Sequence, residues 1–297
     1  MSAVECVLRL REGGGPKGEC PLWDWREQKL YWCDIDGGTQ NRFDPASGSN
    51  EKRSVGEQIG SFALTSKPGT HLIATRSGLH YFDFADGSKR LMVYPEPDLP
   101  ENRLNDGRCD AAGRFWVGSM RDPITASDRC GALYRVTPAG PPTRALDMLG
   151  IPNGIAFSPD SSLMYLADTN TEVRTVWQFD YDLAAGAIAN RRVLVHTGDR
   201  GRPDGACCDV DGCYWSAHLD GGHIARYTPR GDLDRIITLP VQWPSMCAFG
   251  GRNLDILYIT TLRRGGPEAD LPDQPLAGSL FACRPGVQGM RETPFGD

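Results

Sequence analysis

A repeat of short apolar runs, separated by glycine and proline, extends along most of the 297-residue chain. Each repeat reads as strand, turn, strand, turn, and no long helical periodicity interrupts it. Six apolar anchors align at intervals of 41, 43, 49, 50 and 43 residues: Trp32, Ile73, Trp116, Tyr165, Trp215 and Tyr258. One small sheet cannot bury both faces until neighbouring sheets stack on it. The sequence therefore predicts an all-β fold, a six-bladed β-propeller with four-stranded antiparallel blades around a central channel, with residues 1–297 as one domain.

The third repeat differs from the others by two extra segments. Residues 120–131, MRDPITASDRCG, are inserted between its strands, and the proline-rich residues 94–103, YPEPDLPENR, lead into it. We expect both to be loops at one end of the propeller, where binding functions are frequently found.

The composition excludes several classes of partner. The formal net charge of −6 and the pI near 5.4 argue against nucleic-acid binding. No apolar run approaches the roughly 18 to 20 residues of a membrane span, and the first residues lack the apolar stretch of a secretion signal. We therefore expect a cytoplasmic protein whose ten cysteines remain thiols, mostly as small buried hydrophobes, since no C-x-x-C pair occurs. The oligomeric state is left open.

One register of residues, 11 to 13 positions before each anchor, is mostly polar. It contains Glu19, Ser61, Asn105, Asn153, Asp204 and, in the last repeat, Ser245 or Met246. Equivalent positions on the innermost strands of a propeller converge on the channel, so these side chains are predicted to lie close together. Two carboxylates and a carboxamide there would be unfavourable unless a cation neutralised them. Taken singly, Asn153 and Asp204 each precede a glycine and also suit an ordinary turn.

The shared register favours one divalent cation held by Glu19, Asn153 and Asp204. Oxygen ligands suit calcium, magnesium, manganese or ferrous iron, and zinc is also compatible with them. Three protein ligands leave positions open for water and substrate, as in catalytic sites. Asp204 is then placed to take a proton from an attacking water, and Arg103 to donate hydrogen bonds to a substrate oxygen. Asp106 either contacts substrate or only shapes the turn before Gly107.

Four phrases in order, GECPLWD, RLNDGRCDAAGRFWVGSM, NGIAFSPD and RPDGACCDVDGCYW, resemble the senescence marker protein, regucalcin and gluconolactonase family. The likeness extends from about residue 15 to about residue 285. It implies a six-bladed propeller that hydrolyses sugar lactones such as gluconolactone, xylonolactone or arabinonolactone. It also implies metal ligands at Glu19, Asn153 and Asp204, substrate contacts at Arg103, Asn105 and Asp106, and a general-base role for Asp204. The phrase PLAGSLFA, residues 275–282, is similar to bacterial pentonolactonases.

Two departures from the family pattern affect the site. Cys20 replaces the glycine that usually follows the first metal-binding glutamate, which predicts an altered metal preference. After Gly118, Ser119 and Met120, where some relatives place an acidic substrate contact, this chain continues with Arg121, Asp122 and Pro123.

Two alternatives to a lactonase are an arylesterase or phosphotriesterase with the same open metal, and a non-enzymatic calcium-binding propeller. The former commonly keep a second metal or a channel histidine, and no histidine occupies the polar register here.

Overall fold

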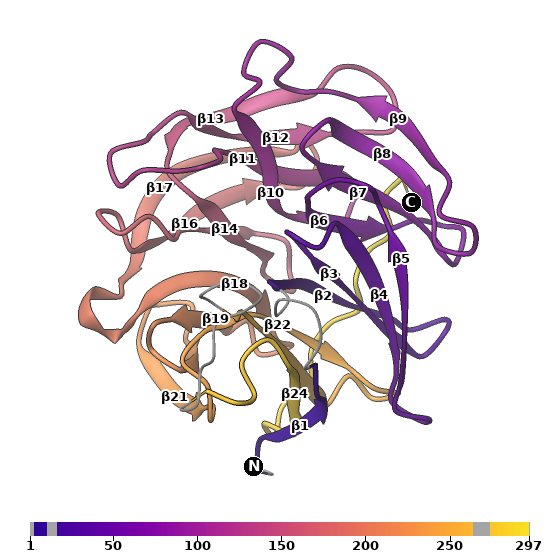
Figure 1. The fold of residues 1–297 in the computed structure, drawn as a ribbon. Coiled ribbons are helices and arrows are strands. Elements are labelled where there is room, and N and C mark those ends of the chain that lie inside the picture. The colour runs from indigo at the N-terminus through magenta and orange to yellow at the C-terminus, as the bar shows by residue number, and fades with distance from the viewer. Residues whose placement is uncertain (1–2, 11–16, 264–273, 297) are drawn as a thin grey trace.

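Six four-stranded antiparallel sheets are arranged around a central axis, so the predicted six-bladed β-propeller is confirmed (Figure 1). The structure is a computed structural model that describes residues 3–10, 17–263 and 274–296. The six aligned anchors all fall on the second strand of their blades, which confirms the repeat alignment.

The first three blades follow the chain in order, each from its innermost to its outermost strand. Blade 1 consists of β2 (Gly18–Asp24), β3 (Lys29–Asp34), β4 (Thr39–Asp44) and β5 (Ser49–Ser54). Blade 2 consists of β6 (Ile59–Leu64), β7 (Thr70–Thr75), β8 (Gly78–Asp83) and β9 (Lys89–Val93). Blade 3 consists of β10 (Asn102–Cys109), β11 (Phe115–Arg121), β12 (Gly131–Val136) and β13 (Thr143–Leu149).

The next two blades repeat the arrangement, and one short 3-10 helix, η1 (Gly198–Arg200), joins them. Blade 4 consists of β14 (Pro152–Phe157), β15 (Leu163–Asp168), β16 (Thr175–Asp182) and β17 (Ala187–His196). Blade 5 consists of β18 (Arg202–Cys208), β19 (Tyr214–Leu219), β20 (His223–Tyr227) and β21 (Leu233–Thr238).

The last blade is built from both ends of the chain. It consists of β22 (Pro244–Gly250), β23 (Ile256–Thr261), β24 (Leu280–Cys283) and, as its outer strand, β1 (Glu5–Leu8). Strand β1 pairs antiparallel with β24, with Glu5 opposite Ala282 and Cys6 opposite Phe281. This pairing closes the ring, and the repeat alignment did not anticipate it.

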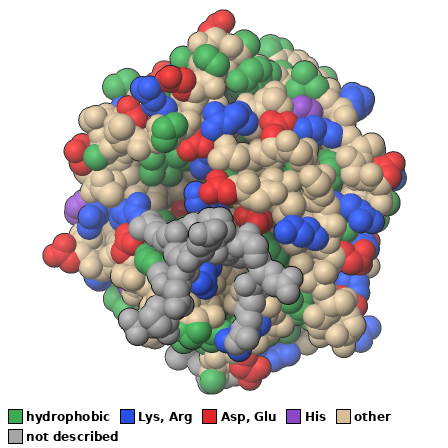
Figure 2. All heavy atoms as spheres, viewed as in Figure 1, with side chains coloured by type: hydrophobic (Ala, Val, Ile, Leu, Met, Phe, Trp, Pro, Cys, Tyr) green, Lys and Arg blue, Asp and Glu red, His purple; other side chains and the backbone are tan. Residues whose placement is uncertain are grey.

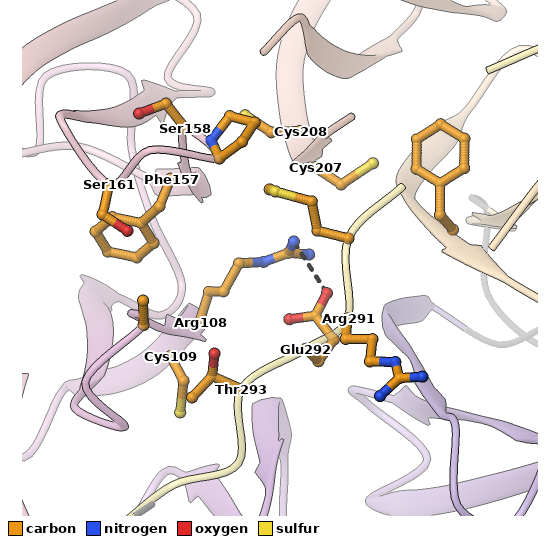
Figure 3. Close-up of a pocket in the computed structure, with 14 residues that line it drawn as sticks. Arg108, Cys109, Phe157, Ser158, Ser161, Cys207, Cys208, Arg291, Glu292 and Thr293 are labelled. Atoms are coloured by element: carbon orange, nitrogen blue, oxygen red, sulfur yellow. Dashed lines mark ion pairs between the residues drawn. The ribbon is translucent and has the colours of Figure 1, made fainter. Parts of the chain in front are cut away.

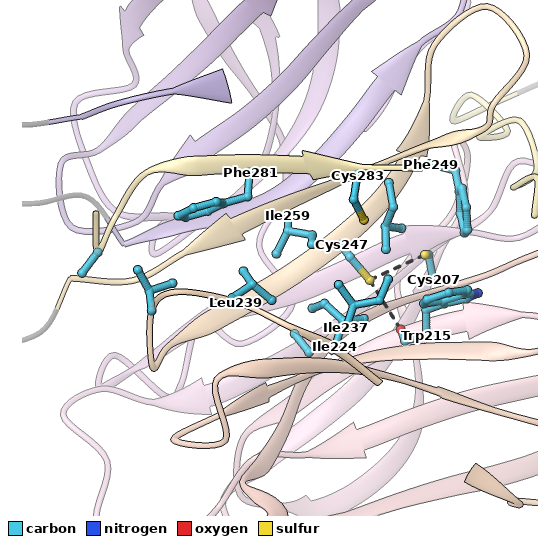
Figure 4. Close-up of a cluster of buried hydrophobic side chains, with 14 residues drawn as sticks. Cys207, Trp215, Ile224, Ile237, Leu239, Cys247, Phe249, Ile259, Phe281 and Cys283 are labelled. Atoms are coloured by element: carbon cyan, nitrogen blue, oxygen red, sulfur yellow. Dashed lines mark hydrogen bonds between the residues drawn. The ribbon is translucent and has the colours of Figure 1, made fainter. Parts of the chain in front are cut away.

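The hydrophobic core lies between the blades, because each sheet covers its faces with the sheets on either side. Figure 4 shows one cluster between blades 5 and 6, where Trp215 of β19 packs with Cys207 of β18 and Phe249 of β22. The rings of Trp215 and Phe249 meet edge to face, with centroids 5.8 Å apart. Such packing fixes the angle between blades and therefore the spacing of the inner strands.

Buried aspartates brace the turns at the ends of two inner strands. Asp110 accepts a hydrogen bond from the indole of Trp116 (2.9 Å), and Asp209 accepts one from Trp215 (2.8 Å). Each aspartate also pairs with an arginine, Arg114 or Arg226. Because each aspartate–tryptophan bond joins a turn to the second strand of the same blade, the two bonds hold the inner strand against its neighbour.

All ten cysteines are free thiols and eight are buried, as the sequence predicted. Within residues 3–10, 17–263 and 274–296, no helix is long and apolar enough to cross a membrane.

Candidate metal centre

Every residue of the predicted polar register lies on an innermost strand, and neighbouring inner strands contact one another around the channel. Glu19, Asn105, Asn153 and Asp204 all lie within the first four residues of their strands, and therefore at the same end of the channel. The extra segments of the third repeat are loops at this end too, since they flank the paired residues Asn102 and Arg121.

The two serines of the register bridge neighbouring blades. The hydroxyl of Ser61 donates to the backbone carbonyl of Asn105 at 2.5 Å, and that of Ser245 donates to the carbonyl of Gly18 at 2.5 Å. Both serines are fully buried. They tie inner strands together, which leaves the acidic and amide side chains as the candidate ligands.

Irregular pairing marks each inner strand near its site residue. The register shifts between Glu19 and Leu22, between Leu104 and Gly107, between Asn153 and Ala156, and between Pro203 and Ala206. A bulge gives one strand an extra residue and re-aims its side chains, and bulges are over-represented beside active sites. These bulges determine which side chains of the inner strands face the channel.

Two equivalent positions in these bulges have a left-handed backbone. Gly154 has φ of 59°, and a Cβ there would lie only 2.3 Å from the hydroxyl oxygen of Tyr214. Cys20, the residue that replaces the usual family glycine, has φ of 47°. Its buried thiol lies 3.4 Å from the backbone nitrogen of Phe62 and 3.6 Å from its carbonyl oxygen. The cysteine therefore adopts the glycine-like conformation, and its side chain is used in packing against blade 2.

A directional chain of hydrogen bonds links four side chains of the site. Arg103 Nη1 donates to Asn105 Oδ1 (2.7 Å), and Asn105 Nδ2 donates to Asn153 Oδ1 (2.9 Å). Asn153 Nδ2 then donates to Thr169 Oγ1 (2.7 Å). The hydroxyl of Thr169 lies 2.7 Å from the carbonyl of Pro203 and 3.4 Å from Asp204 Oδ1. The chain fixes the Asn153 carboxamide at both ends and leaves a lone pair of its oxygen for a further partner.

Thr169 was not among the predicted site residues, because it lies outside the polar register, directly after β15. Its loop is shaped by Asp168, whose carboxylate accepts hydrogen bonds from the backbone amides of Gly150 and Ile151, both at 2.8 Å. The phrase ADTN, residues 167–170, offered a signal, since Asp and Asn at a strand end commonly order a turn.

Negative charges converge on Glu19 from two other blades. Burial raises the pKa of the Glu19 carboxyl well above its usual value, and the nearby Asp204 and Asp106 carboxylates raise the pKa further. The Arg103 guanidinium acts in the opposite direction. A carboxylate repelled in this way is stabilised by a bound cation, and carboxylate and carboxamide oxygens are hard ligands. Glu19, Asn153 and Asp204 therefore have the donor chemistry that a divalent cation requires.

No cluster of three or more His, Cys, Asp or Glu side chains able to hold a metal occurs in the part of the chain that the structure describes. The predicted ligand set has only two carboxylates, with a carboxamide as its third member, so it differs from such a cluster in composition.

Asp106 lies beside this group but has both oxygens engaged. Its Oδ1 accepts a hydrogen bond from the amide of Gly107 (2.8 Å) and its Oδ2 accepts one from Ile155 on β14 (3.2 Å). Burial raises the pKa of its carboxyl to about 6, while the charge of Arg108 and these amides oppose the rise. The bond from Ile155 joins blades 3 and 4 at their bulges. The predicted substrate contact of Asp106 stays a prediction.

The opposite end of the channel contains a separate cavity of about 210 Å³ (Figure 3). Arg108 extends into it and pairs with Glu292 of the C-terminal segment at 3.1 Å. Cys207 and Cys208 line the same cavity. They thus lie away from the end of the channel that contains Glu19, Asn153 and Asp204, the candidate metal-site end.

These features define the class of protein: a six-bladed propeller with a polar, metal-compatible centre at one end of its channel. Residues 17–263 match the family described as SMP-30/Gluconolactonase/LRE-like region, and the chain belongs to this family.

Among its relatives, 6-deoxy-6-sulfogluconolactonase of Pseudomonas putida is 42% identical, with 98% of each chain covered. L-arabinolactonase of Azospirillum brasilense is 35% identical, with 94% of this chain and 91% of that protein covered. The crystal structure of a calcium-binding protein, regucalcin from Agrobacterium tumefaciens, is 28% identical, has a TM-score of 0.87 and covers 98% of this chain and 97% of its own. The predicted family is confirmed, and relatives of this chain are named sugar lactonases.

Proposed function

We propose that this protein hydrolyses sugar lactones to aldonic acids at one divalent cation held by Glu19, Asn153 and Asp204. The convergence of these oxygen donors from three blades is the observation that carries the proposal, at a place where burial and the neighbouring Asp204 raise the pKa of Glu19. The names of the lactonase relatives support the reaction class, and a calcium-binding protein among the similar structures supports a divalent cation.

The protein's own groups have separate roles in this proposal. Asp204 accepts the proton of the attacking water, since a carboxylate next to the reacting carbonyl is a suitable base. Arg103 donates hydrogen bonds to the substrate, and its attachment to Asn105 holds the guanidinium in place. A bound cation polarises the lactone carbonyl and stabilises the negative charge that develops on its oxygen.

Candidate substrates are gluconolactone, xylonolactone and arabinonolactone, together with the sulfonated gluconolactone that the Pseudomonas relative is named for. The test measures initial rates on this panel with a pH indicator, using chelator-stripped protein and adding back calcium, magnesium, manganese, zinc or ferrous iron one at a time. The spontaneous hydrolysis of each lactone is the control.

Turnover well above the spontaneous rate, restored by one cation, supports the proposal. Turnover that is undiminished after complete removal of metal contradicts the metal site. If no lactone reacts although metal binds, lactone hydrolysis is wrong, and aryl esters and phosphotriesters then separate another hydrolase from a non-enzymatic calcium-binding propeller.

A further inference from the structure

Two arginines from different blades share one carboxylate oxygen at the metal-site end of the channel. Arg76 Nη2 lies 2.7 Å from Asp122 Oδ2, and Arg103 Nε lies 3.4 Å from the same atom. Arg76 follows β7 of blade 2, whereas Asp122 follows β11 of blade 3. Gln58 braces Arg76 by accepting hydrogen bonds from its Nε (3.1 Å) and Nη2 (2.9 Å). The Asp122 carboxylate, which follows the Gly118–Met120 triplet, is therefore committed to holding two guanidinium groups.

This arrangement leaves one positive charge in excess, because two guanidinium groups face a single carboxylate. The Glu19 carboxylate also attracts Arg103, but in the proposed function the bound cation neutralises that carboxylate. The two other nearby acidic groups do not cancel the excess, since each has its own lysine. Asp36 pairs with Lys17 and Glu57 pairs with Lys89, both at 2.5 Å.

Both guanidinium groups also keep donors for a ligand. Within the described residues, no hydrogen bond involves Arg103 Nη2 or Arg76 Nη1. Only a tenth of the Arg103 side chain is exposed, whereas about a third of Arg76 is. Figure 2 shows that the centre of this face of the molecule is hollowed and that basic and acidic side chains stand on the wall of the hollow. A charged hydrogen bond at such a partly desolvated position is stronger than one on an open surface.

We propose that Arg76, together with Arg103, selects sugar lactones that carry an anionic group on the sugar, away from the lactone carbonyl. The inference rests on the proposed lactonase function and adds a substrate class to it. Sulfonate, phosphate and carboxylate groups share the required chemistry, because each presents paired oxygens that match a guanidinium. Arg76 acts as a specificity-determining residue, distinct from the groups that perform the hydrolysis.

The experiment compares kcat/KM for glucono-1,5-lactone with kcat/KM for its analogues bearing a 6-phosphate, a 6-sulfonate or a 6-carboxylate. The measured quantity is the ratio of the anionic to the neutral value, so that general damage to the active site cancels. We expect a ratio above one for at least one anion, and a decrease of that ratio by about tenfold in R76Q, as for loss of one charged hydrogen bond. Raising the ionic strength lowers the ratio as well.

Two further variants make the test specific. R121Q is the matched control, because Arg121 precedes Asp122 at the same rim but pairs with Glu101 at 2.6 Å, so its ratio stays at the wild-type value. D122N removes the shared carboxylate and increases the excess positive charge, so its ratio rises. The three anions differ in geometry and charge, and the one with the highest ratio identifies the source of the anionic group.

The outcomes separate this inference from the function on which it rests. One outcome is that the neutral lactone is hydrolysed, the ratio of anionic to neutral kcat/KM is at or below one, and R76Q does not change that ratio. This outcome overturns the anion selectivity but not the lactonase function. Absence of hydrolysis of every lactone overturns both. An equal decrease of the ratio in R121Q and R76Q also contradicts the role of Arg76, because the effect would then come from the general surface charge.

Discussion

Replacing Thr169 by valine tests whether the chain of hydrogen bonds prepares the metal site. Valine has nearly the shape of threonine but no hydroxyl, so the packing stays similar. The change leaves Asn153 Nδ2 without its acceptor at 2.7 Å and the Pro203 carbonyl without its donor at 2.7 Å. Thr169 and Asn153 are 2% and 6% exposed, so water replaces these partners poorly.

The two losses affect different measurements. A buried polar group left without a partner destabilises the fold by about 1–3 kcal/mol, and the Pro203 carbonyl suffers this loss both with and without metal. The metal affinity changes because the Asn153 carboxamide becomes free to rotate its oxygen away from the site, and because Asp204 Oδ1 loses the hydroxyl 3.4 Å away. Removing a residue that orients a ligand typically weakens metal binding by about 10- to 100-fold, or about 1.4–2.8 kcal/mol.

The assay is calorimetric titration of manganese or calcium into chelator-stripped protein, combined with urea unfolding. T197V is the matched control, since the buried Thr197 hydroxyl also donates to a carbonyl, that of Gly201 at 2.6 Å, but touches no predicted ligand. We expect both valine variants to lose stability and T169V alone to lose metal affinity, with T169S restoring it. Wild-type metal affinity in T169V would refute the orienting role of this hydroxyl.

Other predictions follow from the site and from the core. D204A is expected to abolish lactone turnover and metal binding while circular dichroism stays native; full activity would rule out the assignment. R103A should raise KM or lower kcat without loss of bound metal, which elemental analysis checks, and equal loss of metal would make Arg103 structural. G154A should destabilise the fold by about 2–4 kcal/mol in urea unfolding, because its Cβ would press on the Tyr214 hydroxyl at positive φ; wild-type stability would contradict this. Burial lowers the pKa of His71 from 6.5 to about 3, so the unfolded chain binds a proton that the folded chain does not, and stability falls as pH decreases through this interval. H71Q should remove about 1.4 kcal/mol per pH unit of that dependence, and an unchanged slope between wild type and variant would refute the cause.

The fold was predictable from the sequence because each of the six repeats corresponds to one blade. Each of the six anchors, from Trp32 to Tyr258, occupies the same strand of its blade, so one correct alignment places all blades at once. The closing strand β1 was not predictable in this way. It is only four residues long, and its partner β24 lies about 270 positions further along the chain.

The polar register located the candidate ligands but could not show which side chains face the channel. Ser61 and Ser245 occupy the register and yet bond to neighbouring strands, because each inner strand contains a bulge that alters its alternation. The register did not include Thr169, because this residue follows the second strand of its blade and the register lies on the innermost strands. The commitment of Asp122 to two arginines depends on blades 2 and 3 lying side by side, which no local pattern reveals.

The pairing of β1 with β24 means that only non-covalent contacts close the ring of blades. Because β24 lies about 270 residues after β1, the sixth blade is complete only once both segments have been synthesised. Glu19 of blade 1 and Asp204 of blade 5 are separated around the ring by that sixth blade. If β1 separates from β24, we expect the distance between the two carboxylates to increase while the other sheets remain folded. We therefore expect the proposed metal site to be the part of the molecule most sensitive to the loss of this pairing.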